Sequence, residues 1–201
     1  PAIQGKARAE TGPIDGALQL DGKTIVDLGK NVADFNRTDK FSLGAWINSS
    51  TTGAGAIIAR MDDAHGLRGY DLIINEGKLE AHVISKWPGN SISVAAQTAI
   101  TPGEWHHAFL TYDGSSKAAG IKLYVDGEPV PAAVTSDTLT ADSKASDVPL
   151  LIGRRSASTP FSGKLDDVRI YARELNPTEV KGAMGVDLIG QMLAIDPAQR
   201  T

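Results

Sequence analysis

Two β-rich runs near the middle of the chain constrain its fold more than any other feature. Residues Trp105–Tyr112 and Ile121–Val125 are rich in aromatic and β-branched side chains, and an Asp-Gly pair follows each run. A loop of Gly, Ser, Lys and Ala separates them. Runs of this composition form strands, and an Asp-Gly pair favours the positive φ of a tight turn. The sequence therefore predicts a central antiparallel hairpin.

Further strands are indicated on the N-terminal side of this hairpin. Phe41–Asn48 alternates between apolar and small or polar residues, which is typical of a strand with one buried face. Tyr70–Asn75 and Leu79–Ile84 form a second predicted hairpin across a Glu-Gly-Lys turn. If the leucines of this hairpin face the core, Asp71 and His82 face the other way. That second face is the first place to search for a binding site.

We expect the chain to divide into three parts. Residues 1–13 lack periodicity and indicate a linker or an arm, 14–175 form one domain, and 176–201 form a helical tail or a linker to a neighbouring domain. Asn176 and Glu179 have the spacing of a capping box and predict a helix start. A chain of 201 residues with 41% hydrophobic composition is long enough for one all-β domain with a substantial core.

Three sequence blocks resemble a known family. They are ALQLDGKTIVDLG at 17–29, WHHAFLTYDG with IKLYVDG between 105 and 127, and FSGKLDDVRIYARELNPTEV at 161–180. Together they resemble the laminin-G-like and pentraxin-like domains of the concanavalin A-like lectin/glucanase superfamily. The resemblance implies an all-β fold, a two-sheet antiparallel jelly-roll sandwich with a short helical C-terminal tail. It leaves the function open, because this scaffold serves lectins, adhesion modules and glycoside-cleaving enzymes alike.

Composition excludes several classes of function. The net charge is −4 without a basic run, so nucleic acid is not an expected partner. Cysteine is absent, which removes disulfides and thiolate chemistry. No stretch approaches the roughly 18 apolar residues of a membrane span. Because the chain starts with Pro1, we expect a module of a larger, exported bacterial protein, which is extracellular, at the cell surface or periplasmic, with its targeting signal outside this sequence and neighbouring domains as partners.

No catalytic residue is expected, and the sequence predicts a protein that is not an enzyme. Glycoside hydrolases need two carboxylates that face one groove. The acidic pairs Asp62-Asp63 and Asp166-Asp167 are adjacent in sequence, so their side chains point apart on any strand. The neighbouring histidines His106-His107 likewise point apart and cannot ligate one metal ion together. An Asp71 and Glu80 pair across the second hairpin is the weaker catalytic alternative.

Asp166 is the candidate metal ligand. We expect Val168 and Ile170 to face the core, which places Asp166 on the same side, where an unpaired carboxylate costs several kcal/mol. The family resemblance implies a structural calcium held by Asp166, with Asp21 or backbone carbonyls as co-ligands. The alternative is that Asp166 caps a turn or pairs with a nearby basic residue.

Trp87 is the best candidate for a sugar-stacking platform, because it stands next to a Pro-Gly turn and an aromatic face packs well on sugar C–H groups. The alternative is a tryptophan that only anchors its loop. Arg154 and Arg155 suit a carboxylated or sulfated ligand, unless they form a solvated corner. The full set of expected ligand-binding residues is Trp87, Tyr70, His82, Asp71, Arg68 and Arg154.

The sequence supports three candidate functions. We expect a calcium-stabilised, non-catalytic carbohydrate-binding module whose partner is a polysaccharide or glycoconjugate. The alternative is a protein-interaction or spacer domain that binds no glycan, which the low aromatic content of 5% keeps open. A glycoside hydrolase or polysaccharide lyase is the third and weakest candidate. Trp87 and Tyr70 on one concave surface would favour glycan binding.

Overall fold

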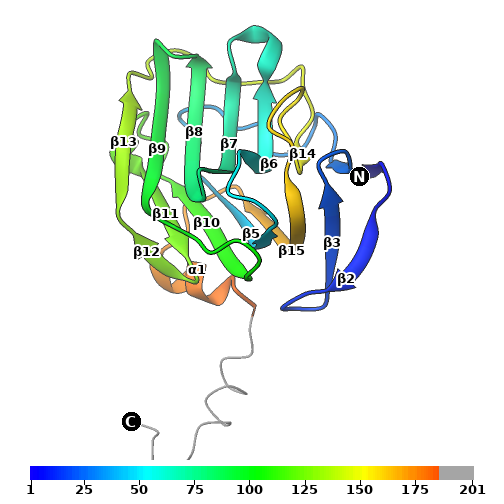
Figure 1. The fold of residues 1–201 in the computed structure, drawn as a ribbon. Coiled ribbons are helices and arrows are strands. Elements are labelled where there is room, and N and C mark those ends of the chain that lie inside the picture. The colour runs from blue at the N-terminus through cyan, green and yellow to red at the C-terminus, as the bar shows by residue number, and fades with distance from the viewer. Residues whose placement is uncertain (186–201) are drawn as a thin grey trace, which may run out of the picture.

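The protein is a sandwich of two antiparallel β-sheets, as a computed structural model describing residues 1–185 shows (Figure 1). The eight-stranded sheet lies in front in Figure 1 and the seven-stranded sheet lies behind it. The fold therefore confirms the predicted all-β jelly-roll sandwich.

The eight-stranded sheet has the order β1 (Ala2–Gln4), β4 (Ile25–Asp27), β14 (Leu151–Ile152), β6 (Gly55–Asp62), β7 (Arg68–Asn75), β8 (Lys78–Lys86), β9 (Asn90–Ala99) and β13 (Ala132–Asp137). The seven-stranded sheet has the order β12 (Glu128–Val130), β11 (Ile121–Val125), β10 (His106–Tyr112), β5 (Phe41–Ser49), β15 (Ser162–Tyr171), β3 (Gly16–Asp21) and β2 (Arg8–Thr11). The short helices are η1 (Asp63–His65), η2 (Ala118–Gly120) and α1 (Pro177–Gly182).

The predicted central hairpin is formed by β10 and β11, with a register that runs from Ala108 opposite Val125 to Tyr112 opposite Ile121. Asp126 and Gly127 then turn the chain into β12 with φ values of 54° and 79°. Two successive residues with positive φ form the turn that matches the twist of a hairpin. The Asp-Gly chemistry of the sequence thus sets this corner of the sheet.

Residues 1–13, which we expected to form a linker or an arm, contain two short edge strands. β1 pairs with β4 at the edge of one sheet, and β2 pairs with β3 at the edge of the other. These four N-terminal strands join the rest of the molecule through the last two strands of residues 1–185: β14 lies between β4 and β6, and β15 lies between β3 and β5. The N-terminal and C-terminal parts are therefore interleaved in both sheets.

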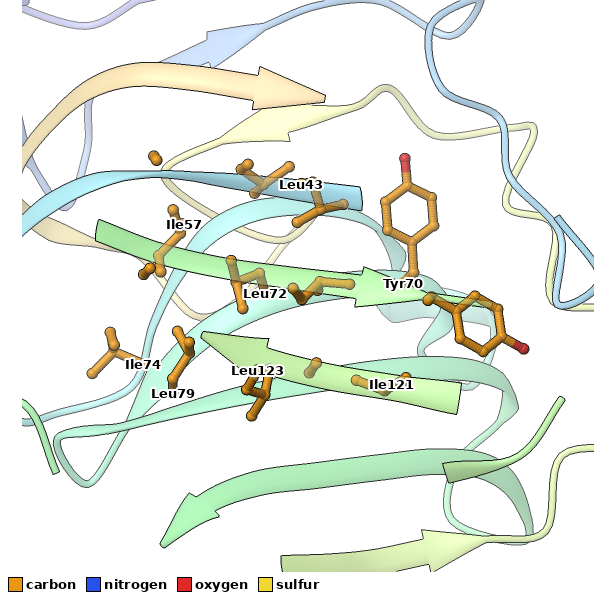
Figure 2. Close-up of a cluster of buried hydrophobic side chains, with 14 of the residues drawn as sticks. Leu43, Ile57, Tyr70, Leu72, Ile74, Leu79, Ile121 and Leu123 are labelled. Carbon is orange, nitrogen blue, oxygen red and sulfur yellow. The ribbon is translucent and has the colours of Figure 1, made fainter. Parts of the chain in front are cut away.

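The core fills the space between the sheets, and Figure 2 shows part of it. Tyr70 lies at one end of this cluster, 2% exposed, with its ring 4.9 Å from that of Phe41. Its hydroxyl donates a hydrogen bond to the Ala33 carbonyl. The expectation that Tyr70 contacts a ligand is therefore wrong, because it shares the inward face of β7 with Leu72.

The predicted helix start is confirmed at α1. The Asn176 side chain accepts a hydrogen bond from the Glu179 backbone, and the Glu179 side chain accepts one from the Asn176 backbone. Val180 packs with Phe109 and Tyr124 on the outer face of the seven-stranded sheet. The rest of the expected helical tail, 186–201, lies outside the described residues. Within residues 1–185, no helix has the length and apolar character needed to cross a membrane.

Gly44 lies on the outer face of the seven-stranded sheet, where the packing leaves no room for a larger side chain. A Cβ at this position would lie 2.1 Å from Cδ2 of Phe109 and 2.4 Å from the Ala108 carbonyl oxygen. We expect Gly44→Ala to lower the free energy of unfolding by about 1–3 kcal/mol through overpacking, as measured by urea denaturation. Gly182→Ala is the control, because nothing lies within 4 Å of its added methyl. A Gly44→Ala variant with unchanged stability would show that β5 and β10 can move apart at little cost in free energy.

Candidate functional site

A pocket lined by several polar side chains lies on the outer face of the eight-stranded sheet, and we call it the outer pocket. Its volume is about 340 Å³. Strands β7, β8 and β9 form its floor, and the loop between β14 and β15 forms one wall. Its apolar lining includes Leu67, Ile73, Ile84 and Trp87, and its polar lining includes Asn75, Glu80, His82, Ser93, Thr135, Arg155 and Thr159.

A buried carboxylate holds the base of the outer pocket. Asp71 and His82 are directly opposite one another on β7 and β8, and Asp71 is fully buried. One Asp71 oxygen is 2.8 Å from His82 Nδ1, and the other accepts a hydrogen bond of 2.6 Å from Arg155 Nε. Both carboxylate oxygens are thus occupied, and the three side chains form one network.

The surroundings of Asp71 determine that its carboxylate is ionised. Burial alone would raise the pKa of Asp71, but the charges and hydrogen bonds of His82 and Arg155 outweigh it and hold that pKa below its usual value. An ionised carboxylate only accepts hydrogen bonds, so His82 must donate from Nδ1. The other ring nitrogen, Nε2, is left for the pocket and lies 4.0 Å from Oε2 of Glu80.

Trp87 stands at the rim of the outer pocket. It lies in the turn between β8 and β9, and 40% of its surface is exposed. Its backbone N–H donates to the Gly66 carbonyl, which ties the turn to the loop before β7. The indole meets the His82 ring edge to face at a centroid distance of 6.0 Å. An exposed aromatic face therefore lies beside a histidine that the sheet holds in place.

The structure brings together three of the predicted ligand-binding residues, Trp87, His82 and Asp71. Arg68 lies in a second, smaller pocket, where its guanidinium donates to the Asp142 carbonyl. The Arg154 side chain donates to the Arg155 carbonyl and does not line the outer pocket. Arg68 and Arg154 are thus corrections to the predicted site, as is the buried Tyr70.

The set of ligand-binding residues expected from the sequence left out Arg155 and Glu80, although both had been considered. The Arg-Arg pair was the signal for the first, but a loop has no periodicity that tells which of two adjacent arginines turns inward. The signal for Glu80 was its place on the same face of β8 as His82, two residues away. Glu80 accepts a hydrogen bond from Asn75 Nδ2.

The predicted calcium ligands do not form a joint site. Asp21 lies opposite Ser162, and Asp166 is four residues further along β15, which places the two about 13 Å apart. Asp21 accepts from the backbone N–H groups of Thr24 and Lys23, and these bonds lower its pKa to about 2. Within residues 1–185, no group of three or more His, Cys, Asp or Glu side chains is placed to hold a metal ion.

Asp166 contacts the N-terminal segment of the chain. It is buried and accepts a hydrogen bond of 3.0 Å from the Ile14 backbone. The register of β15 shifts between Asp166 and Arg169, which turns Val168 outward to 37% exposure. The expectation that Val168 faces the core is wrong, because alternation across a bulge does not continue.

Among the described residues, Glu80 is the one acidic side chain in the lining of the outer pocket. Asp71 is fully buried and does not line the pocket, and both of its carboxylate oxygens are bonded, one to His82 and the other to Arg155. A glycosidase needs one carboxyl group to carry a proton and another to act as base or nucleophile. The arrangement suits binding, since His82 and Arg155 are each held in one orientation.

Residues 20–181 match the family model described as the concanavalin A-like lectin/glucanases superfamily, and the chain belongs to this family. The identification from the three sequence blocks is thus confirmed. The zebrafish (Danio rerio) adhesion G-protein coupled receptor V1 is 25% identical over 147 residues, which cover 70% of this chain and 2% of the receptor. The chain therefore spans a small part of that relative.

Solved structures share the fold at low identity. The CBM40 of Ruminococcus gnavus IT-sialidase, bound to α2,3 sialyllactose, gives a TM-score of 0.63 at 13% identity and covers 90% of this chain and 97% of that chain. Domain 4 of AbnA, an extracellular arabinanase of Geobacillus stearothermophilus in complex with arabinotriose, gives 0.57 at 20% identity, with 90% and 82% covered. At these identities the likeness shows a common fold.

Proposed function

We propose that this chain is a non-catalytic carbohydrate-binding module of a larger exported protein and that it binds a polysaccharide or glycoconjugate in the outer pocket. One observation carries the proposal: Trp87 is exposed beside His82, which the buried Asp71 and Arg155 hold in place. Sugar recognition needs an aromatic face for the C–H groups of the ring and fixed polar groups for its hydroxyls. The outer pocket has both.

The buried network reduces the cost of binding. A side chain that must be ordered by its ligand costs about 0.5–1.5 kcal/mol, whereas His82 and Arg155 are already held by Asp71. The apolar side chains of Ile73 and Ile84 lie between the polar groups and add contact area for a sugar ring. The pocket is thus arranged before a ligand arrives.

Two solved structures with the same fold support this proposal. The CBM40 was solved with sialyllactose and the arabinanase domain with arabinotriose, and both share the fold of this chain. We infer from them a module that is attached to a larger protein and works outside the cytoplasm. The matching part of the adhesion receptor favours a second candidate, a protein-interaction or spacer domain.

Replacing Trp87 with alanine tests the proposal. We expect Trp87→Ala to reduce retention on a glycan gel by about tenfold or more, because the stacking face is lost, with little change in melting temperature. The measurement is affinity electrophoresis through a panel of soluble polysaccharides. Ile3→Ala is the matched control, since Ile3 is an exposed apolar residue on β1, outside the lining of the outer pocket. Wild-type protein that no glycan retards would favour the protein-interaction candidate.

A further inference from the structure

We propose that an apolar pocket between the two sheets, which we call the edge pocket, is a docking site for residues 186–195 of the same chain. The edge pocket has a volume of about 370 Å³ and is lined by strands from both ends of the described chain. It is separate from the outer pocket, so the docking goes beyond the proposed function. Three features carry it: the apolar lining, the place where the described chain ends, and the sequence that follows.

The walls of the edge pocket come from both sheets. Leu18 on β3 lies opposite Leu165 on β15, and Val26 on β4 lies opposite Ile152 on β14, and all four side chains line the pocket. Leu18 and Val26 are only half-buried, and Val168 in the same lining is 37% exposed. Apolar side chains that lie together and remain partly exposed mark a site of interaction.

The lining of the edge pocket suits an apolar occupant. Among residues 1–185, its polar side chains are Asp166 and Asp167. Asp166 accepts a hydrogen bond from the Ile14 backbone, and Asp167 accepts one of 2.8 Å from Arg169 Nε. Both carboxylates thus have partners within the protein. A sugar needs several directed polar contacts, which this lining does not supply, whereas an aliphatic side chain needs none.

The described chain ends beside the edge pocket. The Trp46 indole donates a hydrogen bond of 2.8 Å to the Met184 carbonyl, which holds this end of the chain in place. A Cβ on the next residue, Gly185, would lie 3.4 Å from Oδ2 of Asp167 and 3.3 Å from Cδ1 of Ile14. Asp167 is itself part of the pocket lining. The chain therefore leaves the described part of the structure at the wall of this pocket.

The sequence that follows suits the edge pocket in composition and in length. Residues 186–195 read VDLIGQMLAI, in which Asp187 and Gln191 are the polar exceptions. Three or four extended residues span about 10–14 Å, so Leu188 and Ile189 can reach the pocket from the end of the described chain. A pocket of about 370 Å³ takes more than one aliphatic side chain, since a cavity of roughly 150 Å³ already holds benzene.

A segment of the same chain has an advantage over any separate occupant of the edge pocket. A short tether gives the segment an effective concentration of about millimolar, and a second copy of the chain or a free apolar molecule must compete with it. The docking also decides between the two expectations for residues 176–201, a tail or a linker to a neighbouring domain. Residues 186–195 are then a tail that belongs to this domain.

A single engineered thiol tests the docking, because the chain has no cysteine of its own. Val168→Cys places a thiol in the lining of the edge pocket, and Val134→Cys places one on β13, outside that lining. The measurement is the rate at which each full-length variant reacts with an aromatic disulfide reagent. We expect the Val168→Cys thiol to react about tenfold more slowly than the Val134→Cys thiol, because the docked segment covers it.

Substitutions within the segment identify what covers the pocket. Leu188→Asp should raise the rate at the Val168→Cys thiol about tenfold, because a carboxylate cannot enter an apolar pocket without losing its hydration. Leu188→Ala, the milder variant, should raise that rate by a smaller factor. Gln191→Asp is the matched control, since it adds the same charge at a polar position of the segment and should leave the rate unchanged. A thermal melt of each variant confirms that the compared proteins are folded.

Four results would overturn the docking. The first is an equal rate for the two thiols, and the second is protection that Leu188→Asp does not remove. Protection that disappears on dilution would assign the edge pocket to a second copy of the chain. Protection that is lost when the purified protein is unfolded and refolded would assign the pocket to a captured apolar molecule. Glycan retention is measured separately, so the docking and the proposed function can fail independently.

Discussion

Replacing Asp71 with alanine should lower the free energy of unfolding by about 3–5 kcal/mol. The substitution leaves the largely buried side chains of His82 and Arg155 without the carboxylate that they both contact. The His82 and Arg155 side chains are only 8% and 12% exposed, so water cannot replace the lost hydrogen bonds. The measurement is urea denaturation at pH 7. The same variant should lose glycan retention, because His82 is no longer oriented.

Asp142→Ala is the matched control for this prediction. Asp142 also forms an ion pair with an arginine, Arg68, but its side chain is 58% exposed and the separation is 3.7 Å. An exposed pair of this kind contributes about 0–1 kcal/mol. If both variants lost the same small amount of stability, the network under the outer pocket would not be a buried ion pair.

Acidification should destabilise the protein through His107, by about 3 kcal/mol between pH 6.5 and pH 4. The side chain is fully buried on the outer face of the seven-stranded sheet, between the rings of Trp46 and Phe109. Neither ring nitrogen has a hydrogen-bond partner within residues 1–185. Burial lowers the pKa of His107 from 6.5 to about 4, although the charges of Asp167 and Asp126 oppose the shift.

The direction of this pH effect follows from the difference in proton binding between the folded and the unfolded chain. The unfolded chain takes up the histidine proton near pH 6.5 and the folded chain only near pH 4, so stability falls as the pH drops through this window. Asp21, Asp63 and Asp71 have pKa values lowered from 3.8, and Glu179 has a pKa lowered from 4.5, so the stability that these carboxylates contribute is lost only below 4.5. Above pH 4.5, the histidine effect is therefore separated from acid unfolding driven by these carboxylates.

His107→Phe is the variant that isolates this effect. Urea denaturation of both proteins at intervals between pH 7 and pH 4.5 should give a steep decline for wild type and a flatter one for the variant. The comparison uses the slope of the free energy of unfolding against pH. A constant loss of stability caused by the larger phenylalanine ring does not change that slope. Parallel slopes would mean that His107 binds its proton as readily in the folded chain as in the unfolded one.

The strands in which buried and outward-facing side chains alternate were predictable from the sequence. Phe41–Ser49 and the hairpin of β7 and β8 follow the period of two, and this placed Asp71 and His82 on the outer face, as the structure has them. The edge strand β13 was not predictable in this way. Its side chains are mostly exposed and polar, so no buried face marks it.

The candidate site was predictable only in part, for local reasons. Tyr70 was expected to bind a ligand, but it lies two residues before Leu72 on β7, and alternation along the strand turns its ring into the core with that of Leu72. Arg155 depends on the path of a loop, and Val168 depends on a bulge. Neither feature has a periodic signal, because each is set by contacts between segments distant in sequence.

The interleaving of the chain ends has a consequence for biosynthesis. The strands β1 to β4 are joined to the two sheets by β14 and β15, which the ribosome makes last. Until Leu151 and then Tyr171 have left the exit tunnel, the N-terminal segment has no neighbouring strand in the bulk of either sheet. The domain therefore completes its sandwich after translation of its final strand, and a nascent chain stalled before that point exposes open sheet edges to chaperones.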